Sequence, residues 1–318
     1  METTFACLCP AQRKTELRSR DLAPVEDQVL VRIAACGICR GDLTEFQRPR
    51  EAAEPFGHEP FGQVVSVGPW VRKLRMGDWV VGSLGGAFAT HGLARETDLL
   101  VVPESLGEAG ALAEPLKCVT TVVRAAQPDF GDSVVVVGCG FMGQAAIAAI
   151  AGGWHKQIIA IDTSADRRRQ AMELGAATTV DPRECDAVAE VRRLTGRGAD
   201  AAIDFAGNTQ AATLAAKVLR PRGRLVLAGG YIPQDAGMGI YLGAITIHHA
   251  PPMFSPDPTD DWRRAVDAMI RGRFPVRRFI SHRFGLSQIQ QAFETACDGL
   301  GGQYLKGIIV NDAGGQLT

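Results

Sequence analysis

A glycine-rich turn between an apolar strand and a small-residue helix constrains the fold more than any other feature of the sequence. The valines at 134–137 lead into Gly138-Cys139-Gly140-Phe141-Met142-Gly143, and the small and apolar stretch 144–150 follows. Gly138 allows a tight turn, Gly140 lets the backbone approach a pyrophosphate, and Gly143 permits close helix packing. The helix N-terminus attracts phosphate groups. The pattern therefore predicts a strand-turn-helix unit that binds a dinucleotide.

An acidic residue stands where this kind of unit requires one. Asp162 follows the apolar strand 158–161 and lies about twenty residues after the glycines. A carboxylate there accepts hydrogen bonds from the adenosine ribose and repels a 2′-phosphate, so NAD is the expected cofactor. Arg167 keeps NADP open, because a nearby arginine can accommodate that phosphate. The other residues expected to line the cofactor are Phe141, Met142 and Gly229.

Apolar strands alternate with helix-like segments from residue 132 to about residue 250. The strand-like runs are 133–138, 157–161, 200–205 and 224–228, and the intervening segments 164–174 and 209–219 have helical lengths. This alternation is typical of a parallel sheet covered by helices. We therefore place a doubly wound cofactor domain of the α/β class at residues 119–250.

Residues 25–103 give a different pattern. Short apolar runs at 28–33, 62–68 and 79–82 are bounded by glycine and turn residues, and the helical signal is weak before residue 105. This pattern predicts a β-rich first domain at residues 1–118. Residues 251–318 begin with two prolines and contain helix-like stretches at 260–271 and 286–296 and a strand-like tail at 304–310. We expect them to complete the first domain.

One thiolate, one imidazole and two carboxylates in the first domain have the character of metal ligands. Cys39-Arg40-Gly41-Asp42 is followed by Gly57-His58-Glu59 and, much later, by Ala113-Glu114-Pro115. These donors suit tetrahedral zinc with one position open to water or substrate. The spacing alone is only suggestive, since for any single residue the ordinary alternative, a core histidine for His58 or a surface carboxylate for Glu59, is the more common case. Cys36 and Cys39 form a single CxxC, which is compatible with a redox motif, and no second CxxC completes a four-thiolate site.

Taken together, the motifs resemble the zinc-dependent medium-chain dehydrogenase/reductase family. Along nearly the whole chain they follow the family order: Cys-Gly-Ile-Cys-x-x-Asp, Gly-His-Glu, Val67-Gly68 with Gly77-Asp78, Glu-Pro-Leu, and GxGxxG. The resemblance is closest to the polyol, sugar and threonine dehydrogenases, in which the glutamate of Glu-Pro-Leu replaces a ligand cysteine. It implies a GroES-like catalytic domain, a Rossmann cofactor domain, and hydride transfer between a secondary alcohol and a nicotinamide.

The same resemblance implies roles for individual residues. Cys39 and His58 would bind one catalytic zinc ion, with Glu59 and Glu114 as direct or exchanging, water-mediated ligands. Asp42 would orient His58, as carboxylates beside metal-binding histidines do. Arg40 would face the cofactor pyrophosphate, and Arg167 the adenosine ribose.

The sequence departs from the family pattern in two places. The lobe of four cysteines that binds a structural zinc is absent, because residues 81–89 run directly to the next strand, and this implies one metal ion per chain. Gly41 stands where the family has a serine or threonine that relays the alcohol proton, and Thr44 stands where a histidine often ends the relay. Thr44, His91, or a water on Glu59 or Glu114 is the expected substitute.

The composition limits the classes of partner that the protein is expected to bind. The net charge of -1, with 46% hydrophobic and 22% charged residues, is typical of a folded protein without an electrostatic footprint for nucleic acid or an anionic membrane. The eight cysteines lack the regularity of a disulfide scaffold, and the N-terminus lacks the pattern of a secretory signal, so we expect a cytoplasmic protein with reduced thiols. The partner is then a small alcohol or ketone.

Two rival functions stay open from the sequence. A reductase of an activated C=C or C=N bond needs no alkoxide proton relay, which would suit Gly41, whereas the retained metal ligands argue against it. A nucleotide-binding protein without catalysis is the second rival.

The segment 244–249 resembles the last strand of the cofactor domain, which pairs with its copy in this family, so a homodimer or homotetramer is expected. The adjacent His248 and His249 point to opposite faces of a strand and suit an interface better than a metal site.

Overall fold

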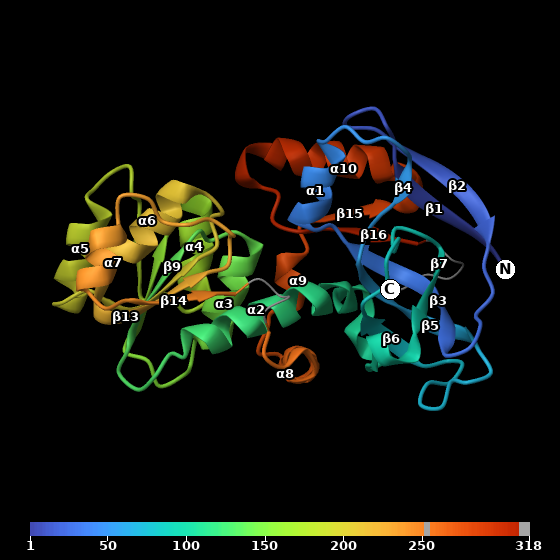
Figure 1. Cartoon of the computed structure of the whole chain (residues 1–318), viewed down its shortest axis with the longest axis horizontal. Helices are drawn as coiled ribbons and strands as arrows, with labels where there is room; N and C mark the ends of the chain where they lie inside the picture. The colour runs from blue at the N-terminus through green and yellow to red at the C-terminus, as the bar shows by residue number, and fades with distance from the viewer. Residues whose placement is uncertain (251–254, 312–318) are drawn as a thin grey trace. The chain divides into compact units, whose positions relative to one another are not determined.

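The computed structural model describes residues 1–250 and 255–311, and it divides into two compact units. Residues 1–115 and the chain from 276 onward form the first unit, and residues 116–275 form the second. The expected divisions lay after residues 118 and 250, so the second unit extends further toward the C-terminus than the sequence suggested. The prolines at 251 and 252, which marked the expected return to the first domain, lie outside the described residues. Figure 1 labels the elements.

The first unit is β-rich, as predicted. Its strands are β1 (Glu2–Leu8), β2 (Thr15–Asp21), β3 (Gln28–Gly37), β4 (Glu54–Pro55), β5 (Glu59–Val67), β6 (Trp79–Gly82), β7 (His91–Arg95), β8 (Leu99–Val101), β15 (His282–Gly285) and β16 (Gly307–Val310). One sheet has the order β15-β16-β3-β5-β6-β8, with β7 also paired to β3, and a smaller sheet has the order β2-β1-β4. The long strand β3 is mostly buried on both faces, which makes it the centre of the unit.

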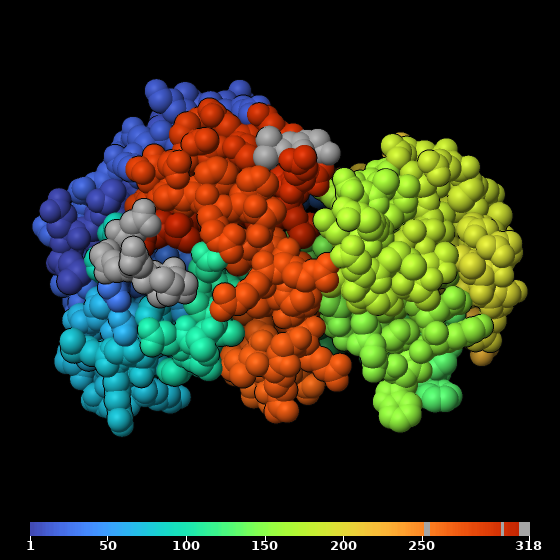
Figure 2. All heavy atoms as spheres, turned by 180° about the vertical axis from the view of Figure 1, so that it is seen from behind, coloured from blue at the N-terminus to red at the C-terminus, as the bar shows by residue number. Residues whose placement is uncertain are grey.

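Two helices of the first unit, one near each end of the chain, are joined by aromatic packing, and the unit has seven helices among its described residues. They are α1 (Arg40–Phe46), α9 (Val276–Phe279), α10 (Ile289–Asp298) and the 3-10 helices η1 (Glu96–Asp98), η2 (Glu104–Leu112), η4 (Leu286–Gln288) and η5 (Gly299–Gly302). The Phe293 ring of α10 lies 5.3 Å from Phe46, the last residue of α1, and 5.0 Å from Phe56. Figure 2 shows the blue N-terminal segments and the red C-terminal segments side by side on one surface. Pairing between distant segments thus holds α1 in place.

The second unit is a doubly wound parallel sheet. Its strands are β9 (Ser133–Val137), β10 (Gln157–Ile161), β11 (Thr178–Val180), β12 (Ala199–Asp204), β13 (Leu219–Leu227) and β14 (Thr246–His249). They follow the order β11-β10-β9-β12-β13-β14, and every neighbouring pair is parallel. This is the strand order of Rossmann folds, in which ligands bind beyond the carboxyl ends of the central strands.

Helices cover both faces of this sheet. They are α2 (Ala113–Ala126), α3 (Phe141–Ile150), α4 (Ala165–Glu173), α5 (Ala187–Thr195), α6 (Thr209–Lys217) and α7 (Gly237–Leu242), of which α2 begins in the first unit. The remaining helix of the second unit is α8 (Pro258–Ile270). Val135 and Val137 pack into one core cluster and Val134 and Val136 into another, because successive strand residues point to opposite faces. An uninterrupted valine run is therefore what this position in the sheet requires.

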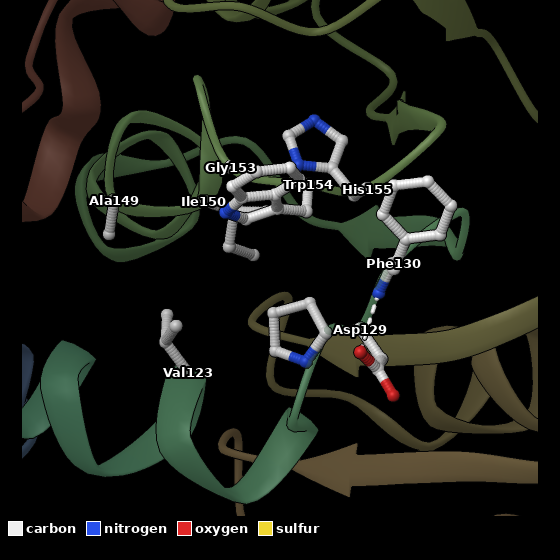
Figure 3. Close-up of a pocket in the computed structure, with 9 residues that line it drawn as sticks. Val123, Asp129, Phe130, Ala149, Ile150, Gly153, Trp154 and His155 are labelled. Atoms are coloured by element: carbon white, nitrogen blue, oxygen red, sulfur yellow. Dashed lines mark hydrogen bonds between the residues drawn. The ribbon is translucent and has the colours of Figure 1, made fainter.

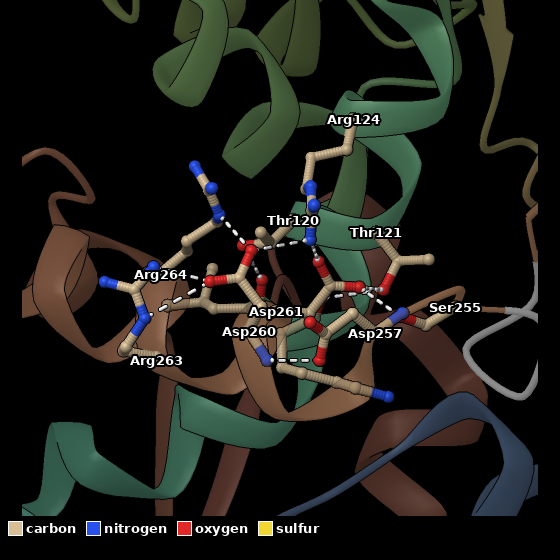
Figure 4. A network of polar contacts seen from close by, with 11 residues as sticks. Thr120, Thr121, Arg124, Ser255, Asp257, Asp260, Asp261, Arg263 and Arg264 are labelled. Atoms are coloured by element: carbon tan, nitrogen blue, oxygen red, sulfur yellow. Dashed lines mark hydrogen bonds and ion pairs between the residues drawn. The ribbon is translucent and has the colours of Figure 1, made fainter.

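A buried polar network joins α2 to α8 within the second unit (Figure 4). Asp261, with no exposed surface, accepts hydrogen bonds from Thr121 Oγ1 and Ser255 Oγ, each at 2.6 Å, and pairs with Arg124. Arg124 also lies 3.2 Å from Asp260. Both oxygens of the buried carboxylate are thus satisfied, so the network fixes the two helices against each other.

Several elements differ from those expected. The helix α1 forms although the sequence before residue 105 gave little helical signal, because Cys39 and Asp42 form a reciprocal capping box at its start. β13 begins at Leu219 rather than at 224. Its first half contains Pro221 and Gly223, which are not typical strand residues, so the sequence carried no strand signal there. The tail expected as a strand from 304 is a strand only from Gly307. Among the described residues, no helix is long and apolar enough to cross a membrane.

Candidate functional site

The structure brings three of the predicted ligands together in the first unit. One donor atom each of Cys39, His58 and Glu59 lies within 4.8 Å of the other two. Thiolate, imidazole and carboxylate are the donors that zinc accepts, and the mutual separation leaves room for one ion between them. The donor set therefore fits a zinc ion. Cys36, the other candidate of the CxxC, is buried in β3 and is not part of this group.

Backbone geometry explains why these three side chains converge. Cys39 caps α1, and its Sγ accepts from the backbone N–H of Gly41 at 3.4 Å. Glu59 begins β5 opposite Gly37, the last residue of β3. Gly57 has φ of +93°, and a Cβ there would lie 2.6 Å from the Phe88 ring. Only glycine is unstrained in this conformation, so the turn that presents His58 and Glu59 depends on it.

Asp42 connects Cys39 to His58. Its Oδ2 accepts from the backbone N–H of Cys39 at 3.0 Å, and its Oδ1 lies 3.4 Å from Nδ1 of His58. The Asp42 contact, together with Cys39, raises the pKa of His58 to about 11. A metal ion would compete with that proton, so metal binding would release it. The orienting role that the resemblance implied for Asp42 is compatible with these distances.

Lys306 is a site residue that sequence reasoning missed. Its Nζ lies 2.9 Å from Glu59 Oε1 and 2.6 Å from Oε2, and it donates to the carbonyl oxygen of Ile38 at 2.9 Å. Both Lys306 and Glu59 are almost fully buried, at 4% and 1% exposure. Burial raises the pKa of Glu59, and the Lys306 ammonium opposes that rise. The carboxylate thus has a buried counter-charge supplied from the C-terminal part of the chain.

The position of Glu59 also requires Gly37. A Cβ at residue 37 would lie 1.9 Å from Glu59 Oε2 and 3.1 Å from the backbone oxygen of Ala111. Any side chain there would displace the carboxylate. The glycine of the CxxC motif therefore makes space for a ligand of the site, which is a role the sequence did not reveal.

We expect Lys306→Met to lower the free energy of unfolding of the metal-free protein by about 2 kcal/mol, because it leaves the Glu59 carboxylate buried without its counter-charge. The loss is limited because Glu59, whose pKa burial already raises, can take up a proton instead. Urea unfolding in the presence of a chelator measures it.

Lys156→Met, at an exposed lysine of the second unit, is the matched control and should leave the unfolding midpoint unchanged. The double variant Lys306→Met with Glu59→Gln should lose less than the sum of the two single variants, because neither charge is left alone. Additive losses would contradict a direct pairing of the two groups.

The remaining residues predicted around the metal lie at the edge of this group. Glu114 is half-buried in the first turn of α2, and its charge acts on Glu59, but it is not among the three converging ligands. Thr44 is exposed, and its hydroxyl donates to the carbonyl oxygen of Arg40 at 3.1 Å. His91 pairs with Arg32 in β3, about 16 Å of strand before Gly37. Of these three, only Glu114 acts electrostatically on the metal-ligand group.

The glycine-rich turn has the geometry that its sequence predicted. Gly138 has φ of +90°, and a Cβ at Gly143 would lie 1.9 Å from the Gly138 carbonyl oxygen. A Cβ at Gly140 would meet no atom within 4 Å, so the backbone there faces open space. Phe141 and Met142 form the first turn of α3. At the end of β13, a Cβ at Gly229 would lie 2.6 Å from Gly207 Cα, so two backbones meet closely at this sheet edge.

Asp162 lies beside the turn at the carboxyl end of β10. Its Oδ2 accepts from the backbone N–H of Cys139 at 2.7 Å, and its Oδ1 accepts from that of Ser164 at 2.8 Å. Arg167 is in the first turn of α4, and within residues 1–250 and 255–311 its buried Nε has no hydrogen-bond partner. Arg40 is exposed at the start of α1, in the first unit. Asp162 and Arg167 therefore lie at the sheet edge where Rossmann folds bind ligands.

A hollow of about 300 Å³ elsewhere in the second unit is separate from this edge (Figure 3). It is lined by the loops before β9 and β10, including the exposed rings of Phe130 and Trp154, whose centroids are 6.2 Å apart. α3 ends at Ile150, and Trp154, which follows it, is 80% exposed. Because these loops precede the strands, the hollow lies at the opposite end of the sheet from the glycine-rich turn.

Comparison with known proteins gives consistent matches. Residues 25–127 match the family model for the alcohol dehydrogenase GroES-like domain, and residues 141–269 match that for zinc-binding dehydrogenases. Sorbitol dehydrogenase of Bacillus subtilis is 25% identical over 307 residues, covering 85% of this chain and 86% of that protein. (R,R)-butanediol dehydrogenase of the same organism is 31% identical over 220 residues, covering 57% and 64%. The crystal structure of an alcohol dehydrogenase zinc-binding domain protein from Burkholderia ambifaria superposes with a TM-score of 0.85 at 26% identity, covering 98% and 99%.

Proposed function

Because the chain belongs to the zinc-dependent medium-chain alcohol dehydrogenase family, we propose that it interconverts a secondary alcohol and its ketone with NAD and one zinc ion per chain. Alcohol and ketone oxidoreduction follows from the family. The substrate class, a polyol, sugar, cyclitol or amino alcohol, follows the names of relatives such as sorbitol and L-threonine 3-dehydrogenases. The observation that carries the proposal is the convergence of Cys39, His58 and Glu59.

The residues at the proposed zinc site have two kinds of role: some bind the ion, and others orient those ligands or balance their charge. Zinc held by Cys39, His58 and Glu59 would supply the Lewis acidity that lowers the pKa of an alcohol. Asp42 fixes the His58 ring through Nδ1 and leaves Nε2 as the nitrogen available for binding. Lys306 balances the charge of Glu59. The chain itself thus provides orientation and charge compensation for each ligand.

A different residue has to replace the proton relay that Gly41 lacks. The hydroxyl of Thr44 is engaged by the Arg40 carbonyl, and His91 lies far along β3. Glu59 is buried, whereas Glu114 is partly exposed and close enough to act on Glu59 electrostatically. Glu114 is therefore the group proposed to pass a proton to solvent.

The cofactor is assigned to the carboxyl edge of the parallel sheet. NAD supplies the hydride acceptor, and the backbone at Gly140 and the N-terminus of α3 can take its pyrophosphate. Asp162 is the proposed partner of the ribose hydroxyls, and the unsatisfied Nε of Arg167 supports a role for that residue at the same sugar. Arg40, Phe141, Met142 and Gly229 complete the proposed set.

A homodimer formed through β14 is the proposed assembly. Within the described residues β14 pairs only with β13, so one edge of the parallel sheet is unpaired. Next to it in the sequence, α7 exposes Met238, Tyr241 and Leu242, at 69%, 80% and 74%. Neighbouring exposed apolar side chains of this kind are typical of protein interfaces.

We expect a panel of secondary alcohols, including polyols and amino alcohols, to yield at least one substrate oxidised with NAD at about tenfold or greater kcat/KM over NADP. The physical reason is the Asp162 carboxylate, which repels a 2′-phosphate by at least the 1.4 kcal/mol that this ratio represents. Initial rates of nicotinamide reduction measure it.

Gly41 favours one alternative, a reductase of an activated C=C or C=N bond, because such a substrate leaves no alkoxide proton to relay. The same panel should therefore include activated alkenes and imines with NADH. Turnover of these without oxidation of any alcohol would establish the alternative and contradict the proposal.

A further inference from the structure

Three charged residues surround the turn that follows β10, and the function proposed above uses none of them. Asp181 directly follows β11, and Val180 is paired with Ile161 in parallel register, so Asp181 and Asp162 end neighbouring strands at the same edge. Asp181 is buried, at 6% exposure. Its carboxylate lies 2.7 Å from Nη1 of Arg168 and 2.8 Å from Nη2 of Arg183.

Both arginines also hold the backbone of the turn. Nη1 of Arg168 lies 2.9 Å from the carbonyl oxygens of Asp162 and of Thr163. Nη2 of Arg183 donates to the Thr163 carbonyl as well. Each guanidinium therefore bridges the buried Asp181 carboxylate and the backbone that carries Asp162.

The charge balance of this group matters for the cofactor. Asp162 and Asp181 together offset Arg168 and Arg183, so the group has no net charge. Ion pairing with Arg183 lowers the pKa of Asp181, which is therefore ionised at neutral pH. An arginine close to the ribose-binding carboxylate is the feature that accommodates the 2′-phosphate of NADP. Besides Arg167, two further arginines lie at that place, and both are engaged by Asp181.

We propose that Asp181 is a specificity-determining residue that acts through Arg168 and Arg183. It holds both guanidinium groups on the carbonyl oxygens of the 162–164 turn and neutralises them, which withholds them from a 2′-phosphate. It is a positioning residue, because it acts through the two arginines that it contacts. The inference rests on the proposed nicotinamide cofactor and extends it from Asp162 to a second acidic residue.

The test compares two probes that lack the nicotinamide, ADP-ribose and its 2′-phosphate, by calorimetric titration of the full chain. For Asp181→Asn we expect the affinity for the 2′-phosphate form, relative to ADP-ribose, to rise about tenfold, the gain from one charge-assisted hydrogen bond to phosphate. Adding Arg183→Gln to Asp181→Asn should remove part of that gain. Asp181→Glu, which keeps the charge, should retain the wild-type ratio.

Glu190→Gln is the matched control. It removes an acidic partner of Arg193 on α5 and should leave the ratio unchanged. If Asp181→Asn alters both affinities in the same proportion, or leaves the ratio at the wild-type value, Asp181 has only a structural role and the inference is wrong. A wild type that prefers the 2′-phosphate form overturns it too. A wild type that binds neither probe would instead contradict the proposed cofactor itself.

Discussion

Replacing Cys39 with alanine is expected to remove the bound zinc and to lower kcat/KM by about a thousandfold. The metal contributes several kcal/mol to stabilising charge on the substrate oxygen, and each 1.4 kcal/mol is a factor of ten in rate. Cys39 supplies the thiolate of the three converging ligands, and no other described cysteine belongs to that group. Elemental analysis of the purified variant and initial-rate kinetics measure the two effects.

Cys36→Ala is the matched control, since it removes the other thiol of the same CxxC motif. Burial raises the pKa of the Cys36 thiol, which keeps it protonated and unsuited to binding a metal ion. The control should retain zinc and most of the activity. A Cys39→Ala protein that keeps full activity without zinc would contradict the metal assignment, and loss of zinc from Cys36→Ala alone would show that the wrong cysteine has been chosen.

Asp261→Ala is expected to lower the free energy of unfolding by about 4 kcal/mol, the cost of breaking a buried ion pair. The variant leaves the Arg124 guanidinium and the hydroxyls of Thr121 and Ser255 without their acceptor (Figure 4). The loss exceeds that expected for Lys306→Met. Asp261→Ala leaves three hydrogen-bond donors without their acceptor, whereas Lys306→Met leaves a single carboxylate without its donor. Urea unfolding followed by tryptophan fluorescence measures it.

Asp267→Ala, on the same helix, removes an exposed carboxylate paired with Arg271 and should leave the unfolding midpoint unchanged. Burial acts to raise the pKa of Asp261, but the hydrogen bonds from Ser255, Thr121 and Arg124 bring it below its ordinary value. The stabilisation is therefore fully present above about pH 4 and is lost as the pH falls further. Equal unfolding midpoints for Asp261→Ala and wild type at neutral pH would contradict a stabilising role for the network.

Local patterns in the sequence were sufficient to predict the cofactor domain. The strand before Gly138, the glycine-rich turn and the strand before Asp162 are consecutive, and a short parallel unit depends on neighbouring segments. The confirmed prediction of a β-rich first domain followed from turn residues at short intervals. β13 was predicted to begin at 224, and this is where its continuous pairing with β12 and β14 begins; before it only Leu219 pairs, with Ala199, and the residues between form an irregularity.

The parts that could not be predicted depend on contacts between distant segments. Lys306 reaches Glu59 because β16 pairs with β3, with Ile308 opposite Gly37, a pairing that no local pattern specifies. Arg168 and Arg183 meet on Asp181 for a similar reason, since β11 lies beside β10. Arg168 belongs to a run of three arginines at 167–169, a pattern typical of a solvated helix face, and yet its side chain is largely buried against Asp181. For Lys306 and for the Asp181 group alike, the signal that the sequence offered was a charged residue next to a short apolar strand.

The most direct test of the account is the zinc content of the purified wild-type protein, measured by elemental analysis together with its NAD-linked alcohol oxidation before and after chelation. We predict about one zinc per chain, held by Cys39, His58 and Glu59, and activity that falls and returns in proportion to the metal. A protein that oxidises a secondary alcohol at an unchanged rate with no zinc bound would contradict the central claim.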